Sequence, residues 1–312
     1  MVIANGKTLG DVVLTKAARW AMGKKCNFKI VMDFPNIEPA QGANVDVLVA
    51  PSHYVSRHSD TEALATAAGA QVVVIPPGVS GSEVFHEVTC DRGTLEKLGC
   101  CDPACLVRCA ISGCKRGHVF INVVGFAGRL APEKGPGLFM VVAEILAKLI
   151  PSAFFVIVGD GPLRTALETA AERLGITSRM YFAGWADEGD LPHLLAGMTL
   201  LFNPSLWPDE TFSIINIQAM SVGTPVAAFG LGGMLEYGNL KLLDSADPRA
   251  ISTAMADLLL DRQRLDALAD RGRAHISSAF RADTSLDHWA DLYDSQEEEE
   301  GGAREPGLPC AE

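Results

Sequence analysis

The chain has 312 residues, of which 48% are hydrophobic, so it is long enough for two domains with buried cores. Its formal net charge of −12 argues against nucleic acid as a partner, because phosphate backbones are bound by an excess of Lys and Arg. Part of this charge lies in the four Glu residues at 297–300, and we expect residues 296–312 to form a disordered acidic tail.

Two segments bear on the compartment of the protein. Residues 1–7 lack the charged-then-apolar layout of a secretory signal. The most apolar long stretch, residues 137–159, contains Glu144, Lys148 and Pro151, and a buried helix followed by a strand explains it better than a membrane span. We therefore predict a cytoplasmic protein, and peripheral contact with a membrane stays open.

The first third of the chain indicates one βαβ unit. Apolar runs at 27–34, 45–50 and 71–75 are typical of strands, and residues 60–69 are typical of a helix. This alternation favours a parallel sheet with helical crossovers. Residues 79–117 are less regular, and we expect the domain boundary there.

Cysteines gather in this irregular segment. The chain has eight Cys, and six of them are Cys90, Cys100, Cys101, Cys105, Cys109 and Cys114. The spacing is a poor match to the paired knuckles of zinc sites, and disulfides are rare in the cytosol. We interpret the segment as a linker with free thiols and predict no metal site.

From residue 119 onward, strands and helices alternate regularly. We expect strands at 119–127, 153–158, 179–182, 199–203, 225–229 and 240–243, and helices at 138–149, 163–174, 190–195 and 212–222. A further helix should open at Asp247 and Pro248, which suit the N-cap and first helical positions. The pattern predicts a Rossmann-like domain whose ligand lies beyond the carboxyl ends of the strands.

Charged residues follow the first of these strands. Arg129 and Lys134 flank a turn just before a helix, and two cations beside helix N-terminal amides can clamp a pyrophosphate. The alternative is a pair of ordinary exposed cations. After the second strand, Gly159 and Asp160 permit close backbone approach to a ligand, or serve only as a turn.

Glu210 and Gln218 follow the strand at 199–203. Placed at the start of a helix and about two turns along it, they could accept hydrogen bonds from two hydroxyl-bearing parts of one extended ligand. The alternatives are a first-turn acid favoured by the helix dipole and a polar residue on a helix face.

Taken in order, these motifs resemble glycosyltransferase family 4 and its GT-B relatives. The matching segments are Gly128-Arg129-Leu130, Glu133-Lys134-Gly135, Gly159-Asp160-Gly161-Pro162, Phe182-Ala183-Gly184, Pro204-Ser205, Glu210, Gly223-Thr224-Pro225-Val226 and Gly232-Gly233-Met234-Leu235-Glu236. Upstream, residues 49–55 and 74–79 resemble the last βαβ unit of the family's first domain, and Trp289 to Tyr293 resembles its terminal crossover helix.

The resemblance implies a GT-B fold and a retaining, metal-independent hexosyltransferase that uses no cofactor. The donor would be a UDP-, GDP- or ADP-linked sugar, and the acceptor a sugar, glycan or lipid. Glu210 would contact the transferred sugar. The pyrophosphate would be held by Arg129, Lys134 and the backbone around Thr211, Phe212 and Ser213, and Gln218 would lie at the ribose.

The implied domains are a shortened N-terminal Rossmann-like domain with its linker (1–115), a complete donor-binding Rossmann-like domain (116–280), a crossover helix (281–295) and the tail (296–312). Three departures support the alternative that the protein binds a nucleotide sugar without turnover. Gln218 and Ser213 replace the usual Glu and Gly, and the first domain lacks the segment with the family's catalytic His. A phosphorylase is disfavoured because no Lys of the second domain stands in a recognisable cofactor context.

Overall fold

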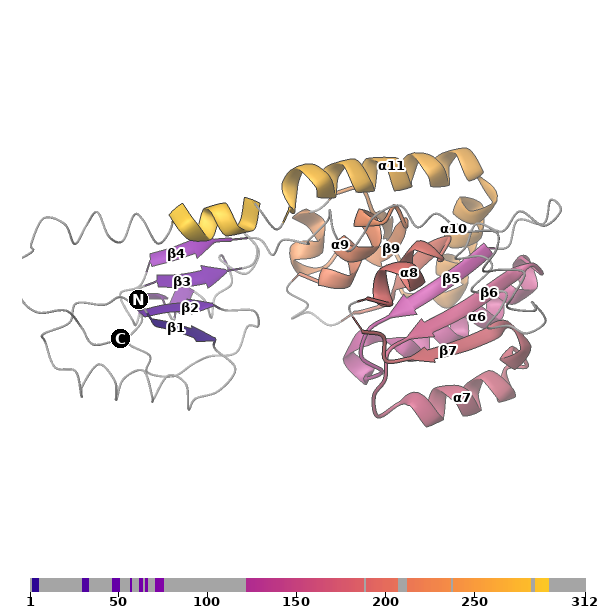
Figure 1. The fold of residues 1–312 in the computed structure, drawn as a ribbon. Helices are drawn as coiled ribbons and strands as arrows, with labels where there is room; N and C mark the ends of the chain where they lie inside the picture. The colour runs from indigo at the N-terminus through magenta and orange to yellow at the C-terminus, as the bar shows by residue number, and fades with distance from the viewer. Residues whose placement is uncertain are drawn as a thin grey trace, which may run out of the picture. The chain divides into compact units, whose positions relative to one another are not determined.

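The computed structural model describes a defined set of residues, namely 2–5, 30–33, 47–50, 57, 62–63, 65–66, 71–75, 122–187, 189–206, 212–236, 238–281 and 284–291. Contacts between Cα atoms divide the chain into two units, one with residues 1–78 and 282–312 and the other with residues 79–281. The two units carry separate sheets, and each unit is considered by itself (Figure 1).

The first unit contains a four-stranded parallel sheet. Its strands lie side by side in sequence order: β1 (Val2–Asn5), β2 (Ile30–Asp33), β3 (Val47–Ala50) and β4 (Gln71–Val74). The predicted strands at 27–34, 45–50 and 71–75 are confirmed as β2, β3 and β4. Strand β1 was not predicted, because four residues give too short a pattern to show periodicity.

A small apolar cluster packs on this sheet. Val49 and Ile75 are buried, and Trp289, from the helical residues 284–291, packs against them. The N–H group of Ile75 donates to the carbonyl of Ala50 at 3.0 Å and extends the pairing of β3 with β4 by one residue. The helix near the C-terminus therefore contributes to the core of the N-terminal sheet.

The second unit is built on a six-stranded parallel sheet with the order β10-β9-β8-β5-β6-β7. The strands are β5 (Asn122–Ala127), β6 (Ala153–Val158), β7 (Met180–Gly184), β8 (Leu200–Asn203), β9 (Val226–Phe229) and β10 (Lys241–Leu243). Read in chain order, this is the doubly wound arrangement in which the strand order reverses beside the first strand. The predicted Rossmann-like sheet is thus confirmed.

Helices cover both faces of this sheet (Figure 1). They are α6 (Pro136–Leu149), α7 (Arg164–Arg173), α8 (Leu191–Ala196), α9 (Ile214–Ser221), α10 (Pro248–Leu260) and α11 (Arg262–Ala279). Helices α6, α7 and α10 share one core cluster, while α8 and α9 share the other. Helix α11 begins beside α10 and ends beside α9, so it links the two layers.

The ends of several helices follow directly from the sequence. Asp247 caps α10 by accepting hydrogen bonds from the N–H groups of Arg249 and Ala250, as predicted. Gly175 ends α7 in a left-handed conformation (φ 69°), also as predicted. Helix α9, however, begins at Ile214 rather than at residue 212, because Ser213 before it has a positive φ of 52°.

Candidate donor-binding site

The reversal of strand order places the candidate site beyond β5 and β8. These two strands are neighbours, and the chain leaves them toward opposite faces of the sheet, through α6 and α9. Such a switch point opens a crevice at the carboxyl ends of the strands, where open α/β sheets bind ligands. The residues after β5 and after β8 are therefore the first to consider.

The segment after β5 carries both predicted phosphate-binding cations. Arg129 is exposed and forms an ion pair with Glu133, and Lys134 ends a short 3-10 helix, η2 (Pro132–Lys134). Gly135 follows with φ 68° and leads into Pro136, the first residue of α6. An exposed pair such as Arg129–Glu133 contributes at most about 1 kcal/mol, so the guanidinium can exchange this partner for a phosphate at little cost.

The segments after β5 and β8 contact each other directly. The hydroxyl of Ser205 donates to the carbonyl of Glu133 at 3.1 Å. A Cβ atom on Gly135 would lie 2.5 Å from the carbonyl oxygen of Pro204, so only Gly permits this approach. Beside the contact lies an open hollow of about 440 Å³, lined by Pro132, Glu133, Gly135, Leu138, Pro204 and Leu206. The loops after β5 and β8 thus bound a hollow, and its lining residues, among those described, include none of the predicted donor-binding residues.

The glycines after β6 serve the packing of neighbouring loops. Gly159 and Gly161 have φ angles of 129° and 155°, and a Cβ atom on either would clash with the backbone after β5, at Gly128 and Leu130 respectively. The N–H of Leu130 donates to the carbonyl of Asp160 at 2.9 Å. The close approach that Gly159 permits in the structure is to the loop after β5, and its approach to a ligand stays a prediction.

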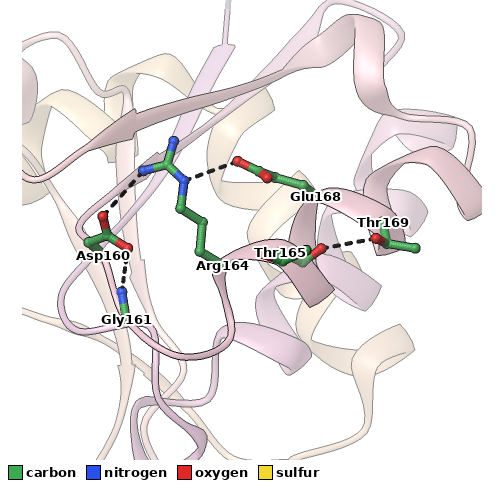
Figure 2. Close-up of polar contacts among 6 residues, drawn as sticks. All are labelled: Asp160, Gly161, Arg164, Thr165, Glu168 and Thr169. Carbon is green, nitrogen blue, oxygen red and sulfur yellow. Dashed lines mark hydrogen bonds and ion pairs between the residues drawn. The ribbon is translucent and has the colours of Figure 1, made fainter.

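Asp160 is engaged locally (Figure 2). Its carboxylate accepts from the N–H of Gly161 at 2.7 Å and lies 3.6 Å from the guanidinium of Arg164. Arg164 also donates to Glu168 at 3.0 Å. These contacts tie the loop after β6 to the first turn of α7, and the sequence pattern had not singled out Arg164.

The segment after β8 carries the proposed sugar- and phosphate-binding residues. Glu210 and Thr211 lie outside the described residues. Phe212 is 3% exposed, and its ring lies 5.7 Å from that of Phe280, so its side chain belongs to the core. Ser213 is the N-cap of α9 and lies close to the end of β8. The N-terminus of α9 is therefore at the switch point, as predicted.

A partly buried cluster of hydrogen bonds joins the end of β8 to this turn. The amide nitrogen of Asn203, the last residue of β8, donates to the hydroxyl of Ser213 at 2.8 Å and to the side-chain oxygen of Asn216 at 3.0 Å. Its amide oxygen accepts from the N–H of Ser205 at 3.2 Å. Asn203 and Asn216 were missed from the sequence, although an Asn within the run Ile214-Ile215-Asn216-Ile217 is itself a signal of a buried polar contact.

Gln218 lies on the second turn of α9. It is half-buried and shares a helix face with Ile214, four residues earlier, which is 51% exposed. The neighbouring positions Ile217 and Ala219 are buried in the core. The side of α9 that carries Gln218 is thus partly accessible.

The described residues form neither a metal-binding group nor a membrane-spanning helix. Among the described residues, no group of three or more His, Cys, Asp and Glu side chains is placed to hold a metal ion. Residues 90–114, with the cysteine cluster, lie outside the described part of the chain. None of the helices in the described ranges combines the length and apolarity needed to cross a membrane.

The doubly wound six-stranded parallel sheet has the architecture of a Rossmann-like domain. Residues 121–275 match the family model described as Glycosyl transferases group 1. This part of the chain is therefore a glycosyl transferases group 1 domain.

Two relatives agree with this family. The chain is 36% identical over 114 residues to 2-deoxystreptamine glucosyltransferase of Streptomyces kanamyceticus, covering 36% of this chain and 29% of that protein. It is 30% identical over 236 residues to D-inositol 3-phosphate glycosyltransferase of Salinispora tropica, covering 72% of this chain and 46% of that protein. The chain thus spans less than half the length of these two relatives.

The structural comparison bears on the fold alone. The crystal structure of Anabaena HepE in complex with UDP-glucose matches with a TM-score of 0.69 and 19% identity, over 94% of this chain and 78% of that one. Sucrose-phosphate synthase from Thermosynechococcus elongatus matches with a TM-score of 0.65 and 19% identity, over 89% and 70%. Both support the predicted GT-B fold.

Proposed function

We propose that the protein is a glycosyltransferase that moves a hexose from a nucleotide-diphosphate sugar to an acceptor hydroxyl with retention of configuration. The observation that carries the proposal is the contact between the segment of Arg129 and Lys134 and the segment that leads into α9, at the switch point of a group 1 domain. Cations and helix N–H groups are the usual partners of a diphosphate.

The proposed roles of the residues are those that the resemblance to the family implies. Arg129 and Lys134 hold the diphosphate together with the backbone of residues 211–213, and Gln218 accepts from the ribose. Gly159 and Asp160 shape the loop beside the cations. Glu210 acts at the transferred sugar, with no metal ion and no cofactor taking part. Relatives support this class of donor, since one is named a GDP-mannose-dependent mannosyltransferase and HepE was solved with UDP-glucose.

Binding can be tested by thermal melting with UDP, GDP or ADP at millimolar concentration. At a hundredfold excess over Kd, a ligand stabilises the folded state by about 2.7 kcal/mol, which is a shift of several degrees for a domain of this size. Lys134→Ala should remove the shift. Lys148→Ala is the matched control, because this Lys is exposed on α6 and pairs only locally with Glu144. No shift with any nucleotide would contradict the proposal.

Turnover needs a separate test. Consumption of a nucleotide sugar in the presence of EDTA should be abolished by Glu210→Gln, and the anomeric configuration of the product, read by NMR, should match that of the donor. A panel of sugar, glycan and lipid acceptors, with and without vesicles, identifies the acceptor and tests peripheral membrane contact. A cytoplasmic location is part of the proposal, and fractionation of the native host tests it.

A further inference from the structure

Asn203 connects both ends of the segment that carries Glu210. Its side-chain oxygen binds the backbone of Ser205, and its side-chain nitrogen binds the hydroxyl of Ser213. The segment between these two residues leads from β8 into the first turn of α9. One amide group, fixed at the end of a central strand, therefore sets the relative positions of the two ends of this segment.

The same amide also holds the first turn of α9 from below. Asn216 is the third residue of the helix and is fully buried at 0% exposure, and its side-chain oxygen accepts from Asn203 at 3.0 Å. Its side-chain nitrogen donates to the thioether of Met234 at 3.3 Å, which is a weak acceptor. Met234 belongs to η4 (Gly232–Glu236), so the loop after β9 joins the same cluster.

This cluster is a poor way to stabilise a core. A buried amide that donates to sulfur recovers only part of its lost hydration, and an aliphatic residue at 216 would bury no polar side-chain group. What the amides provide instead is direction, because each bond requires one orientation of its partner. Such directed contacts beneath a ligand-binding turn hold the atoms that contact the ligand in place.

We propose that Asn203 is a positioning residue for the donor diphosphate: through Ser213 and Asn216 it holds the first turn of α9 in the orientation in which its N–H groups meet the phosphates. The proposal rests on the proposed function, since it assumes that a nucleotide diphosphate binds at this turn. In this proposal Asn203 acts through the turn and does not itself contact the donor. Its amide is already engaged by four protein groups, those of Ser205, Ser213, Asn216 and Met234.

The test compares nucleoside diphosphate and monophosphate binding by calorimetry, using the best ligand among UDP, GDP and ADP. Asn203→Leu should lower the affinity for the diphosphate by about tenfold or more, since displacement of a binding group by about 1 Å has effects of this order. The affinity for the monophosphate, which makes fewer contacts with the turn, should fall much less. Donor KM should rise correspondingly, with a smaller change in kcat.

Asn216→Leu is the second variant, and it keeps the proposal testable if Asn203→Leu does not fold. This substitution replaces the buried amide with an apolar side chain of similar shape, so the position stays filled. Because Asn216 has 0% exposure, its side chain cannot touch the ligand. Asn216→Leu should also lower the affinity for the diphosphate. The affinity of the double variant should be little below that of Asn203→Leu alone, because the two side chains act as one unit.

Thr224→Val is the matched control. Thr224 is buried just beyond the other end of α9, and its hydroxyl donates to the carbonyl of Leu195 at 2.7 Å. The control should lower the melting temperature and leave both nucleotide affinities unchanged. Equal losses for the diphosphate and the monophosphate in Asn203→Leu, or an equal diphosphate loss in Thr224→Val, would overturn the positioning role. Wild-type protein that binds no nucleotide would overturn the proposed function, and this role with it.

Discussion

Ser213 offers a stability test whose sign depends on its backbone conformation. We compare Ser213→Gly with Ser213→Ala. Both variants lose the hydroxyl that accepts from Asn203, so this loss cancels in the comparison. With φ at 52°, a Cβ atom costs about 1–2 kcal/mol, while the greater freedom of Gly in the unfolded chain offsets about 0.5–1 kcal/mol of that. The Gly variant should therefore be more stable than the Ala variant by roughly 1 kcal/mol.

Thermal melting of the full chain measures this difference. For a unit of this size, 1 kcal/mol corresponds to about 2–4 °C, so the Gly variant should melt a few degrees above the Ala variant. Ser221, the last residue of α9, provides the control. There the order should reverse, because Ala is favoured over Gly by about 1 kcal/mol within a helix. An Ala variant at 213 that is more stable than the Gly variant would refute the left-handed conformation and the argument built on it.

Other substitutions can be judged by the same melting experiment. Gly159→Ala should destabilise by about 2 kcal/mol or more, because its Cβ atom would meet the backbone of Gly128, and unchanged melting would contradict that packing. Gly137→Ala should stabilise by about 0.4–1 kcal/mol, since the added methyl group meets open space on α6; a lower melting temperature would count against it. Gly223→Ala should cost about 1–3 kcal/mol, because this Gly ends α9 with φ 81°, and a neutral result would exclude the left-handed cap. Asp247→Ala should cost about 1 kcal/mol through loss of the α10 cap, whereas Asp247→Asn should keep most of it.

The sheet of the second unit was predictable because its strands are buried on both faces. Such strands are continuous apolar runs bounded by Gly, Pro or Asp, and residues 153–158 were placed at both ends without error. Helix ends with a chemical signal, such as Asp247 and Gly175, were also placed well. The start of α9 was missed because nothing in the residue type of Ser213 indicates a positive φ.

The candidate site was predictable as a region, and less so as a set of contacts. Parallel strands bring their carboxyl ends to one edge, so the contact between the segment after β5 and the segment after β8 followed from the alternation alone. The role of Gly159 could not follow from it, because its partner is the backbone of Gly128, 31 residues earlier. The amide cluster of Asn203 and Asn216 likewise depends on side-chain directions that no periodicity records.

The loops after β5, β6 and β7 are joined through main-chain groups. The N–H of Gly128 donates to the carbonyl of Val158, and the N–H of Gly159 donates to that of Gly184, at 3.0 and 2.7 Å. Peptide groups are the same in every residue, so this junction tolerates almost any side chain except at the glycines themselves. Side chains of these loops that contact a sugar, a base or an acceptor can therefore change in evolution while the main-chain hydrogen bonds between the loops are kept. Randomised libraries that spare these glycines should then yield folded proteins with altered ligand preference far more often than libraries that include them.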